Sequence, residues 1–209
     1  MISTTSLTEL EISSRLTSAW KKPLDPYSED YPSISVINNQ TLVPAAVLIP
    51  FLKIEEAWHL LFTRRNENLT VHSGQVAFPG GRTDPEDHNP ESTALREANE
   101  EIGLNPSDVR ILGKLNGFIT ITNYIVTPVV GTIPWPYPLQ MAAEEVSKVF
   151  TIPLDWLSNP ENYQERRRIL PDPYGQMPVI YYHPYQDEVL WGVSARLTLS
   201  LIQVLESNL

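Results

Sequence analysis

The sequence of 209 residues contains no cysteine. This absence excludes disulfide bonds, zinc–thiolate centres and cysteine nucleophiles, and it fits a reducing compartment. The longest apolar run, VPAAVLIPFL at residues 43–52, is too short to span a bilayer. The segment MISTTSLTELEISSRLTSAW lacks the basic start and apolar core of a signal peptide. We therefore expect a soluble, cytoplasmic protein with no membrane partner.

Basic residues are scarce, with 15 Lys and Arg against 25 Asp and Glu and a formal net charge of −10. This balance argues against a nucleic-acid backbone as the main partner, because phosphate binding needs clustered Lys and Arg. An acidic enzyme can still act on phosphates if a divalent cation bridges the two. The sequence also lacks the G-x-S-x-G, GxxxxGK[ST], H-E-x-x-H and GxGxxG motifs. Metal binding by carboxylates is therefore the chemistry to look for.

Hydrophobic periodicity predicts one mixed α/β domain with an N-terminal extension. Residues 8–20 form an amphipathic helix, and a proline-rich polar linker follows it. Residues 45–53 and 57–65 read as strands, 74–81 as an extended piece, 109–133 as two or three strands and 144–158 as a strand running into a helical turn. We expect a turn-prone insertion at 161–176, a hairpin at 177–191 and a closing helix at 192–208. The division is an N-terminal helix and linker (1–40) and a catalytic domain (41–209).

The acids gather in one segment, FPGGRTDPEDHNPESTALREANEEIGL, at residues 78–104. Its carboxylates are Asp84, Glu86, Asp87, Glu91, Glu97, Glu100 and Glu101. Asn89 and Pro90 signal the start of a helix, and Gly103 signals its end. No lysine lies between residues 82 and 110 to form the i,i+4 pairs that support an ordinary acidic helix surface. A solvated acidic face is the alternative interpretation.

The expected helix has two faces with different roles. The face that packs on a sheet is formed by Leu95, Ala98 and Ile102. The second face carries Glu97, Glu100 and Glu101. The double glycine of FPGG, just before the helix, allows a backbone carbonyl to approach closely. Carboxylate and carbonyl oxygens are the ligands that magnesium and manganese prefer.

The run REANEEIG, residues 96–103, resembles the end of the Nudix hydrolase signature, R-E-x-x-E-E-x-G. The front half of the signature differs, because Asp87 stands nine residues before Arg96 where the family has a glutamate eight before. This insertion resembles the subgroup of coenzyme A pyrophosphatases. The upstream run LLFTRRNENLTVHSGQVAFPGG also resembles that subgroup's motif, except that Asn66 replaces a small residue and Thr70 an arginine.

The resemblance covers residues 44–205, since NYIVTPVVGTIP, EEVSKVFTIPLDWL and VLWGVSARL are similar too. It implies an α/β/α sandwich with a mixed β-sheet between helices. It also implies hydrolysis of the diphosphate bond of coenzyme A or its derivatives to 4′-phosphopantetheine and adenosine 3′,5′-bisphosphate, using Mg²⁺ or Mn²⁺. The alternatives are another nucleoside diphosphate derivative, such as ADP-ribose or NADH, and a Nudix-fold module that binds a nucleotide without cleaving it. The partner is a small molecule, and a homodimer is one option.

The resemblance also assigns roles to residues. Glu97 and Glu101, with Glu100 close behind, are the expected metal ligands, and a carbonyl of Gly80 or Gly81 completes the set. The general base is expected in a later loop, where Glu145 competes with Glu144.

Arginines have the other expected roles. Arg96 is expected to point away from the carboxylate face and to hold Asp87 or Glu100 in place. Arg65 is expected to contact substrate phosphates. The run ERRR at 165–168 is an anion-attracting or merely solvated loop, His72 a partner of the glycine turn, and Trp191 and Tyr124 packing residues.

Overall fold

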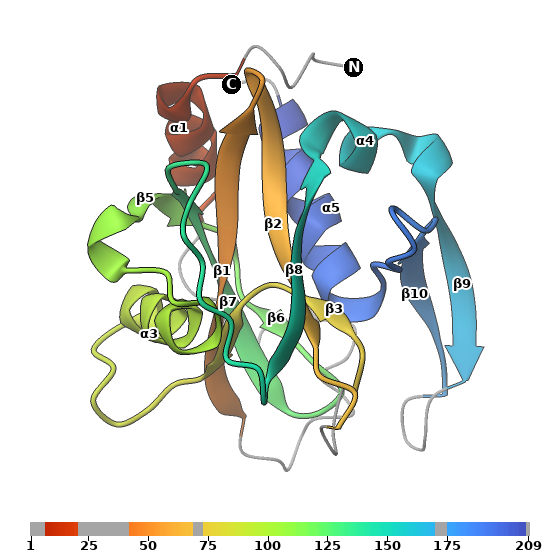
Figure 1. Ribbon diagram of the computed structural model, residues 1–209. Coiled ribbons are helices and arrows are strands. Elements are labelled where there is room, and N and C mark those ends of the chain that lie inside the picture. The colour runs from red at the N-terminus through yellow and green to blue at the C-terminus, as the bar shows by residue number, and fades with distance from the viewer. Residues whose placement is uncertain (1–6, 21–41, 69–72, 170–174, 208–209) are drawn as a thin grey trace.

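The computed structural model describes residues 7–20, 42–68, 73–169 and 175–207 (Figure 1). The helices are α1 (Glu9–Ala19), α3 (Pro90–Ile102), α4 (Leu154–Ser158) and α5 (Gly192–Glu206), with 3-10 turns η2 (Pro106–Asp108) and η3 (Pro160–Asn162). The strands are β1 (Val43–Ile54), β2 (Ala57–Arg65), β3 (Val76–Ala77), β4 (Gly80–Arg82), β5 (Arg110–Lys114), β6 (Phe118–Ile119), β7 (Tyr124–Thr132), β8 (Val146–Pro153), β9 (Tyr163–Ile169) and β10 (Gln176–Tyr182). In the described ranges, no helix is both long and apolar enough to cross a membrane.

The main sheet is mixed. β1 pairs with β7 in parallel and with β2 and β4 in antiparallel fashion, and β8 pairs with the other edge of β2. β1 meets β2 only from Phe51 onward, while its first half meets β4 at residues 45–47. β2 in turn meets β3 near its own end. The two long strands therefore diverge, and the short β3–β4 segment with its double glycine lies between them.

Two apolar layers cover the sheet because side chains alternate along each strand. Ile49, Phe51, Leu60 and Phe62 belong to the cluster shared with α1, α4 and α5. Leu48, Leu52 and Leu61 belong to the cluster shared with α3. This gives helices on both faces of a mixed sheet, so the expected α/β/α sandwich is confirmed (Figure 1). The same alternation sends Arg64 and Arg65 to opposite faces.

The N-terminal helix packs on this core. Thr8 caps α1 by accepting from the backbone N–H of Glu11, and Ile12 and Leu16 are fully buried in the cluster shared with α5. The indole Nε1–H of Trp58 donates to the carbonyl of Leu7 at 2.7 Å. The expected amphipathic helix at 8–20 is therefore confirmed, and it joins the same core as the sheet.

The hairpin expected at 177–191 is present in a narrow form, with antiparallel bridges Tyr181↔Trp191 and Tyr185↔Glu188. One other expectation for this part of the chain is wrong. Within the polar run expected to be a turn-prone insertion, β9 (Tyr163–Ile169) is a strand, and it pairs with β10 from Tyr163↔Tyr182 to Ile169↔Gln176. The reason is a packing one, since β10 buries Ile180 and Tyr182 in the core and leaves its other edge for β9. The polarity of β9 reflects exposure of its side chains, not an absence of strand.

Candidate active site

The acidic helix α3 begins and ends where its sequence signals predict. The Asn89 side chain accepts from the backbone N–H of Ser92 at 2.8 Å, Pro90 is the first helical residue and Gly103 ends the helix at φ +69°. The buried row facing the sheet is Ala94, Ala98 and Ile102. Leu95 was expected in that row but is only half-buried, because the helix is rotated so that Ala94 and Glu101 face inward.

Glu101 is a buried carboxylate in an apolar layer. Its side chain is 4% exposed and pairs with Arg65, whose Nη1 lies 3.5 Å from Oε1. The other oxygen, Oε2, is buried and has no partner among the described residues. Burial raises the pKa of Glu101 to about 8, aided by the charges of Glu97 and Glu145 and opposed by Arg65 and a backbone hydrogen bond from Gly80. The site therefore favours a cation next to Glu101.

Glu97 lies against the double-glycine turn. A Cβ placed on Gly81 would stand 2.5–2.6 Å from the Glu97 carboxylate group, so only glycine leaves room for this side chain. Burial raises the pKa of Glu97, while its hydrogen bond from Arg96 lowers it and the charges of Glu100 and Glu145 raise it further. Gly80 is packed even more tightly, with a Cβ position 2.4 Å from the carbonyl oxygen of Ala46. The FPGG turn thus sets how close β4 lies to α3.

Arg96 was expected to point away from the carboxylate face. In the structure it contacts that face. Its Nη1 donates to Glu97 Oε1 at 2.9 Å and to Glu100 Oε2 at 3.0 Å, and its Nη2 donates to Asp87 Oδ2 at 2.9 Å. The hydrogen bonds from Arg96 lower the pKa of Asp87 to about 2. Asp87 also accepts from the backbone N–H of Asp84, which closes the turn before the helix. Arg96 therefore ties the inserted turn to two of the glutamates.

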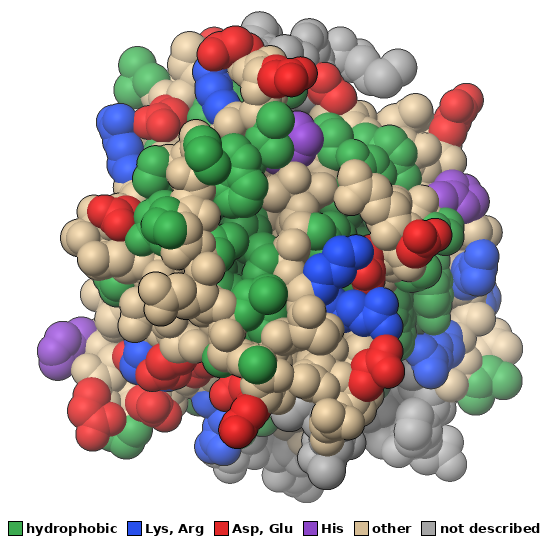
Figure 2. Space-filling view, in the orientation of Figure 1, with side chains coloured by type: hydrophobic (Ala, Val, Ile, Leu, Met, Phe, Trp, Pro, Cys, Tyr) green, Lys and Arg blue, Asp and Glu red, His purple; other side chains and the backbone are tan. Residues whose placement is uncertain are grey.

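The three helix glutamates lie in different environments. Glu101 is buried, the Glu97 side chain is 17% exposed, and the Glu100 side chain is 57% exposed and bound to Arg96. Acidic side chains gather at the lower left of the space-filling view, over α3 and the loop before it (Figure 2). In the described ranges, no three Asp, Glu or His side chains are arranged as a ready-made metal centre. Arg65 and Arg96 hold Glu101 and Glu97 in the present arrangement.

Glu145 reaches the same place from β8, and its negative charge raises the pKa values of both Glu97 and Glu101. Its backbone carbonyl accepts from the N–H of Asn66 at 2.8 Å, and the Asn66 amide donates to the carbonyl of Ala143 at 2.7 Å. Glu144 and Glu145 are both exposed. The charge effect on Glu97 and Glu101 favours Glu145 as the one nearer the candidate site.

This loop is positioned by a β-bulge that was not predicted from the sequence. Arg64 pairs with Lys148 and Arg65 with Val146, so Ser147 is the extra residue of β8. Its hydroxyl donates to the carbonyls of Arg64 at 3.1 Å and Arg65 at 3.4 Å. The bulge turns Val146 into the α3 layer and fixes where Glu145 leaves the strand.

The residues fit a divalent cation. Glu101 has a buried carboxylate oxygen without a partner among the described residues, and the negative charges of Glu97 and Glu145 act on it. A bound cation would relieve the repulsion among these three carboxylates. Carboxylate oxygens are suitable ligands for Mg²⁺ or Mn²⁺. The ligand roles of Glu97, Glu100 and Glu101 and of the Gly80 or Gly81 carbonyl stay predictions.

The remaining sequence predictions are placed as follows. Arg64 contacts Glu188 on the opposite face of the sheet from Arg65. The arginines of 165–168 are exposed on β9, where Arg166 and Arg168 lie over the rings of Tyr181 and Trp191. Tyr181 and Trp191 stack at 5.5 Å, consistent with a packing role. His72 and Thr70 lie outside the described residues.

Comparison with known proteins gives consistent matches. A family model described as the NUDIX domain matches residues 42–173. Two similar proteins are each named uncharacterized Nudix hydrolase NudL. The one from Photorhabdus laumondii is 38% identical over 163 residues, 76% of this chain and 83% of that protein. The one from Yersinia pestis strain Pestoides F is 40% identical over 162 residues, 76% of this chain and 78% of that protein.

Solved structures add a likeness of fold. A MutT/nudix family protein from Enterococcus faecalis has a TM-score of 0.51 with 14% identity, covering 80% of this chain and 68% of that one. At this identity the likeness concerns the fold alone.

Proposed function

Because this chain belongs to the Nudix hydrolase family, we propose that it cleaves the diphosphate bond of coenzyme A or a derivative, with Mg²⁺ or Mn²⁺ held by the α3 glutamates. Enzymes of this family hydrolyse nucleoside diphosphate derivatives and generally use divalent metal ions. The observation that carries the proposal is the buried Glu101 with its unpartnered oxygen, next to Glu97 on the glycine turn. The choice of coenzyme A is supported by the inserted Asp87 turn and by the run LLFTRRNENLTVHSGQVAFPGG.

Each residue has a proposed task. Glu97 and Glu101, with Glu100 at the exposed side, supply carboxylate oxygens to the cation. Gly80 and Gly81 bring the backbone of β4 close to the same point. Arg65 leaves β2 on the α3 face and pairs with Glu101, and it would contact a substrate phosphate in the metal-loaded enzyme.

The reaction needs a polarised phosphate and an activated water. The bound cation supplies charge neutralisation and acidifies the attacking water. The water oxygen forms a bond to one phosphorus of the diphosphate, and the bond from that phosphorus to the bridging oxygen breaks. The proton lost by the water passes to the carboxylate of Glu145, which is the proposed general base. Arg96 holds Glu97 and Glu100 in place and does not itself touch the substrate.

The test is a product assay with purified protein, coenzyme A and MnCl₂. The expected products are 4′-phosphopantetheine and adenosine 3′,5′-bisphosphate in equal amounts. Good turnover of ADP-ribose or NADH without turnover of coenzyme A would move the proposal to another nucleoside diphosphate derivative. Binding of these compounds with no turnover of any of them would indicate a module that binds a nucleotide without cleaving it.

A further inference from the structure

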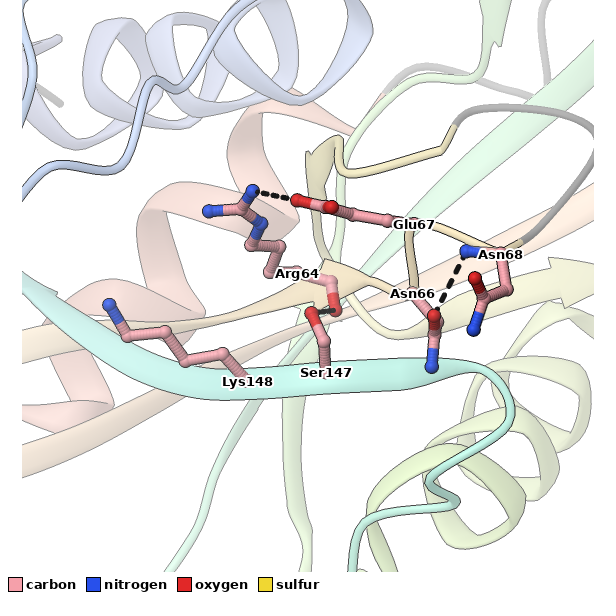
Figure 3. A pocket seen from close by; sticks show the side chains of 6 residues that line it. All are labelled: Arg64, Asn66, Glu67, Asn68, Ser147 and Lys148. Atoms are coloured by element: carbon pink, nitrogen blue, oxygen red, sulfur yellow. Dashed lines mark hydrogen bonds and ion pairs between the residues drawn. The ribbon is translucent and has the colours of Figure 1, made fainter.

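A shallow pocket of about 490 Å³ opens at the ends of β2 and β8 (Figure 3). Its lining is Arg64, Asn66, Glu67, Asn68, Ser147 and Lys148. All of these except Glu67 carry side chains that donate hydrogen bonds. Two of them are cations, on a chain whose net charge is −10. The pocket therefore differs in charge from the acidic site next to it.

The two cations are held in place by one buried carboxylate. Arg64 and Lys148 are cross-strand partners, and Figure 3 shows their side chains projecting to the same side of the strand pair. Glu188, which is buried, lies 2.9 Å from Lys148 Nζ and 3.4 Å from Arg64 Nη1. The three groups together carry one net positive charge. In the present arrangement this charge is balanced by the carboxylate of Glu67, which also pairs with Arg64.

Glu67 occupies part of the pocket in the present arrangement. Its carboxylate lies 2.7 Å from Arg64 Nη2, but its side chain is 71% exposed. An exposed ion pair of this kind contributes little free energy, so a more highly charged anion can displace the Glu67 carboxylate from Arg64.

Lys and Arg side chains, drawn in blue, are visible at the centre and right of the space-filling view, where β8, β9 and β10 lie (Figures 1 and 2).

The pocket is close to the candidate active site. Asn66, which lines the pocket, donates its backbone N–H to the carbonyl of Glu145, and the charge of Glu145 acts on Glu97 and Glu101. Lys148 follows Glu145 by three residues, with the bulge at Ser147 between them. Arg64 and Arg65 are consecutive and leave β2 on opposite faces, so the pocket and the glutamates lie on two sides of one strand end.

We propose that this pocket is an anion subsite, which holds a phosphomonoester of the substrate while the diphosphate of the same molecule lies at the α3 glutamates. A phosphomonoester carries nearly two negative charges and three acceptor oxygens. The guanidinium of Arg64 and the ammonium of Lys148 supply matching charged donors. This inference rests on the proposed function and extends it, because it restricts the substrates to diphosphates that bear a separate phosphate group.

The test compares coenzyme A with dephospho-coenzyme A, which lacks only the 3′-phosphomonoester. We expect the wild-type enzyme to have a kcat/KM for coenzyme A about ten-fold or more above that for dephospho-coenzyme A. In K148M this ratio is expected to fall to about one, because the KM for coenzyme A rises while the KM for dephospho-coenzyme A does not change. Because the ratio is taken on one preparation, a partly unfolded sample does not change it.

Lys53 offers a matched control. Its side chain is 45% exposed against 43% for Lys148, and each lysine pairs with one glutamate and lies over one aromatic ring. K53M is expected to keep the wild-type ratio. E67Q removes the competing carboxylate and is expected to lower the KM for coenzyme A by about two- to five-fold, with no change for dephospho-coenzyme A. A wild-type ratio of one, or a ratio left unchanged by K148M, overturns the proposal.

Failure of the proposed function is separated from failure of the subsite by a binding measurement. Adenosine 3′,5′-bisphosphate and AMP are titrated into the wild-type protein and K148M by calorimetry. Wild-type protein is expected to bind the bisphosphate about ten-fold or more tightly than AMP, and K148M to bind the two alike. If this preference is found without turnover of coenzyme A, the subsite stands and the proposed reaction fails. If the preference is missing, the subsite is wrong whatever the enzyme cleaves.

Discussion

Replacing Gly81 with alanine places a methyl group where the Glu97 carboxylate now lies. The new Cβ would stand 2.5 Å from Cδ and 2.6 Å from each carboxylate oxygen. To reach an ordinary contact at 3.4 Å, the carboxylate must move by about 0.8–0.9 Å. The Gly81 backbone is not in the left-handed region, so alanine brings no backbone strain of its own. The substitution therefore acts on the position of one carboxylate.

A displacement of about 1 Å in a reacting group lowers a rate by about 100-fold. We therefore expect kcat of G81A to fall by roughly that factor at saturating Mn²⁺. The free energy of unfolding is expected to change by less than about 1 kcal/mol, because the contacted atoms are the far end of a flexible side chain. Steady-state kinetics and urea unfolding, measured on one preparation, separate the two effects.

Gly80 provides the contrast. Its Cβ position lies 2.4 Å from the backbone oxygen of Ala46 and 2.6 Å from the Cα of Val47, so β4 must move away from β1. G80A is expected to lower the free energy of unfolding by about 1–3 kcal/mol as well as the activity. If G81A keeps the wild-type kcat and metal requirement, Glu97 does not act from its present position and the reasoning is refuted.

Other predictions concern the remaining groups of the site. E145Q is expected to lower kcat by about 100-fold or more and E144Q to leave it unchanged; equal effects of the two would exclude Glu145 as the base. Without metal, the free energy of unfolding is expected to fall as the pH rises from about 5 to about 8. The reason is that burial raises the pKa of Glu101 to about 8 and also raises that of Glu97, so the folded state binds protons more readily than the unfolded state. Denaturant titrations in EDTA should show this slope in the wild-type protein and a weaker one in E101Q; a slope of the opposite sign would contradict the burial argument. R96K keeps the charge but not the planar fork, and it is expected to lower kcat about ten-fold, which kinetics at saturating metal would check; unchanged kcat would show that the fork is not needed.

Helix α3 was predictable because its signals are local. The cap at Asn89, the proline after it and the glycine at 103 each act within a few residues, so their effect does not depend on the tertiary structure. Helical spacing also predicted that Glu97 and Glu101 share one face of α3. It did not predict that Glu101 would be buried, since helical spacing fixes only relative direction. Its ion-pair partner, Arg65, comes from β2, which is distant in the sequence.

Two of the missed features arise from strand pairing, which the local sequence does not reveal. The bulge at Ser147 depends on the pairing of β8 with β2, and nothing in EEVSKVF marks an extra residue. β9 is polar along its length, so periodicity has no apolar face to detect. Its strand form comes from pairing with β10, which packs Ile180 into the core. Arg96 was expected to hold Asp87 or Glu100, and it bonds to both. Its bond to Glu97 was not expected, because Arg96 was assigned to point away from the carboxylate face.

The most direct test of the metal site is the rate of coenzyme A hydrolysis by E101Q at saturating Mn²⁺. Glutamine keeps the size of the side chain but removes the charge that the cation needs. We expect kcat to fall by about 100-fold or more. The unfolding midpoint is expected to be unchanged or raised, because glutamine, unlike a buried carboxyl with a raised pKa, need not take up a proton on folding. A rate for E101Q equal to that of the wild-type enzyme would contradict the account.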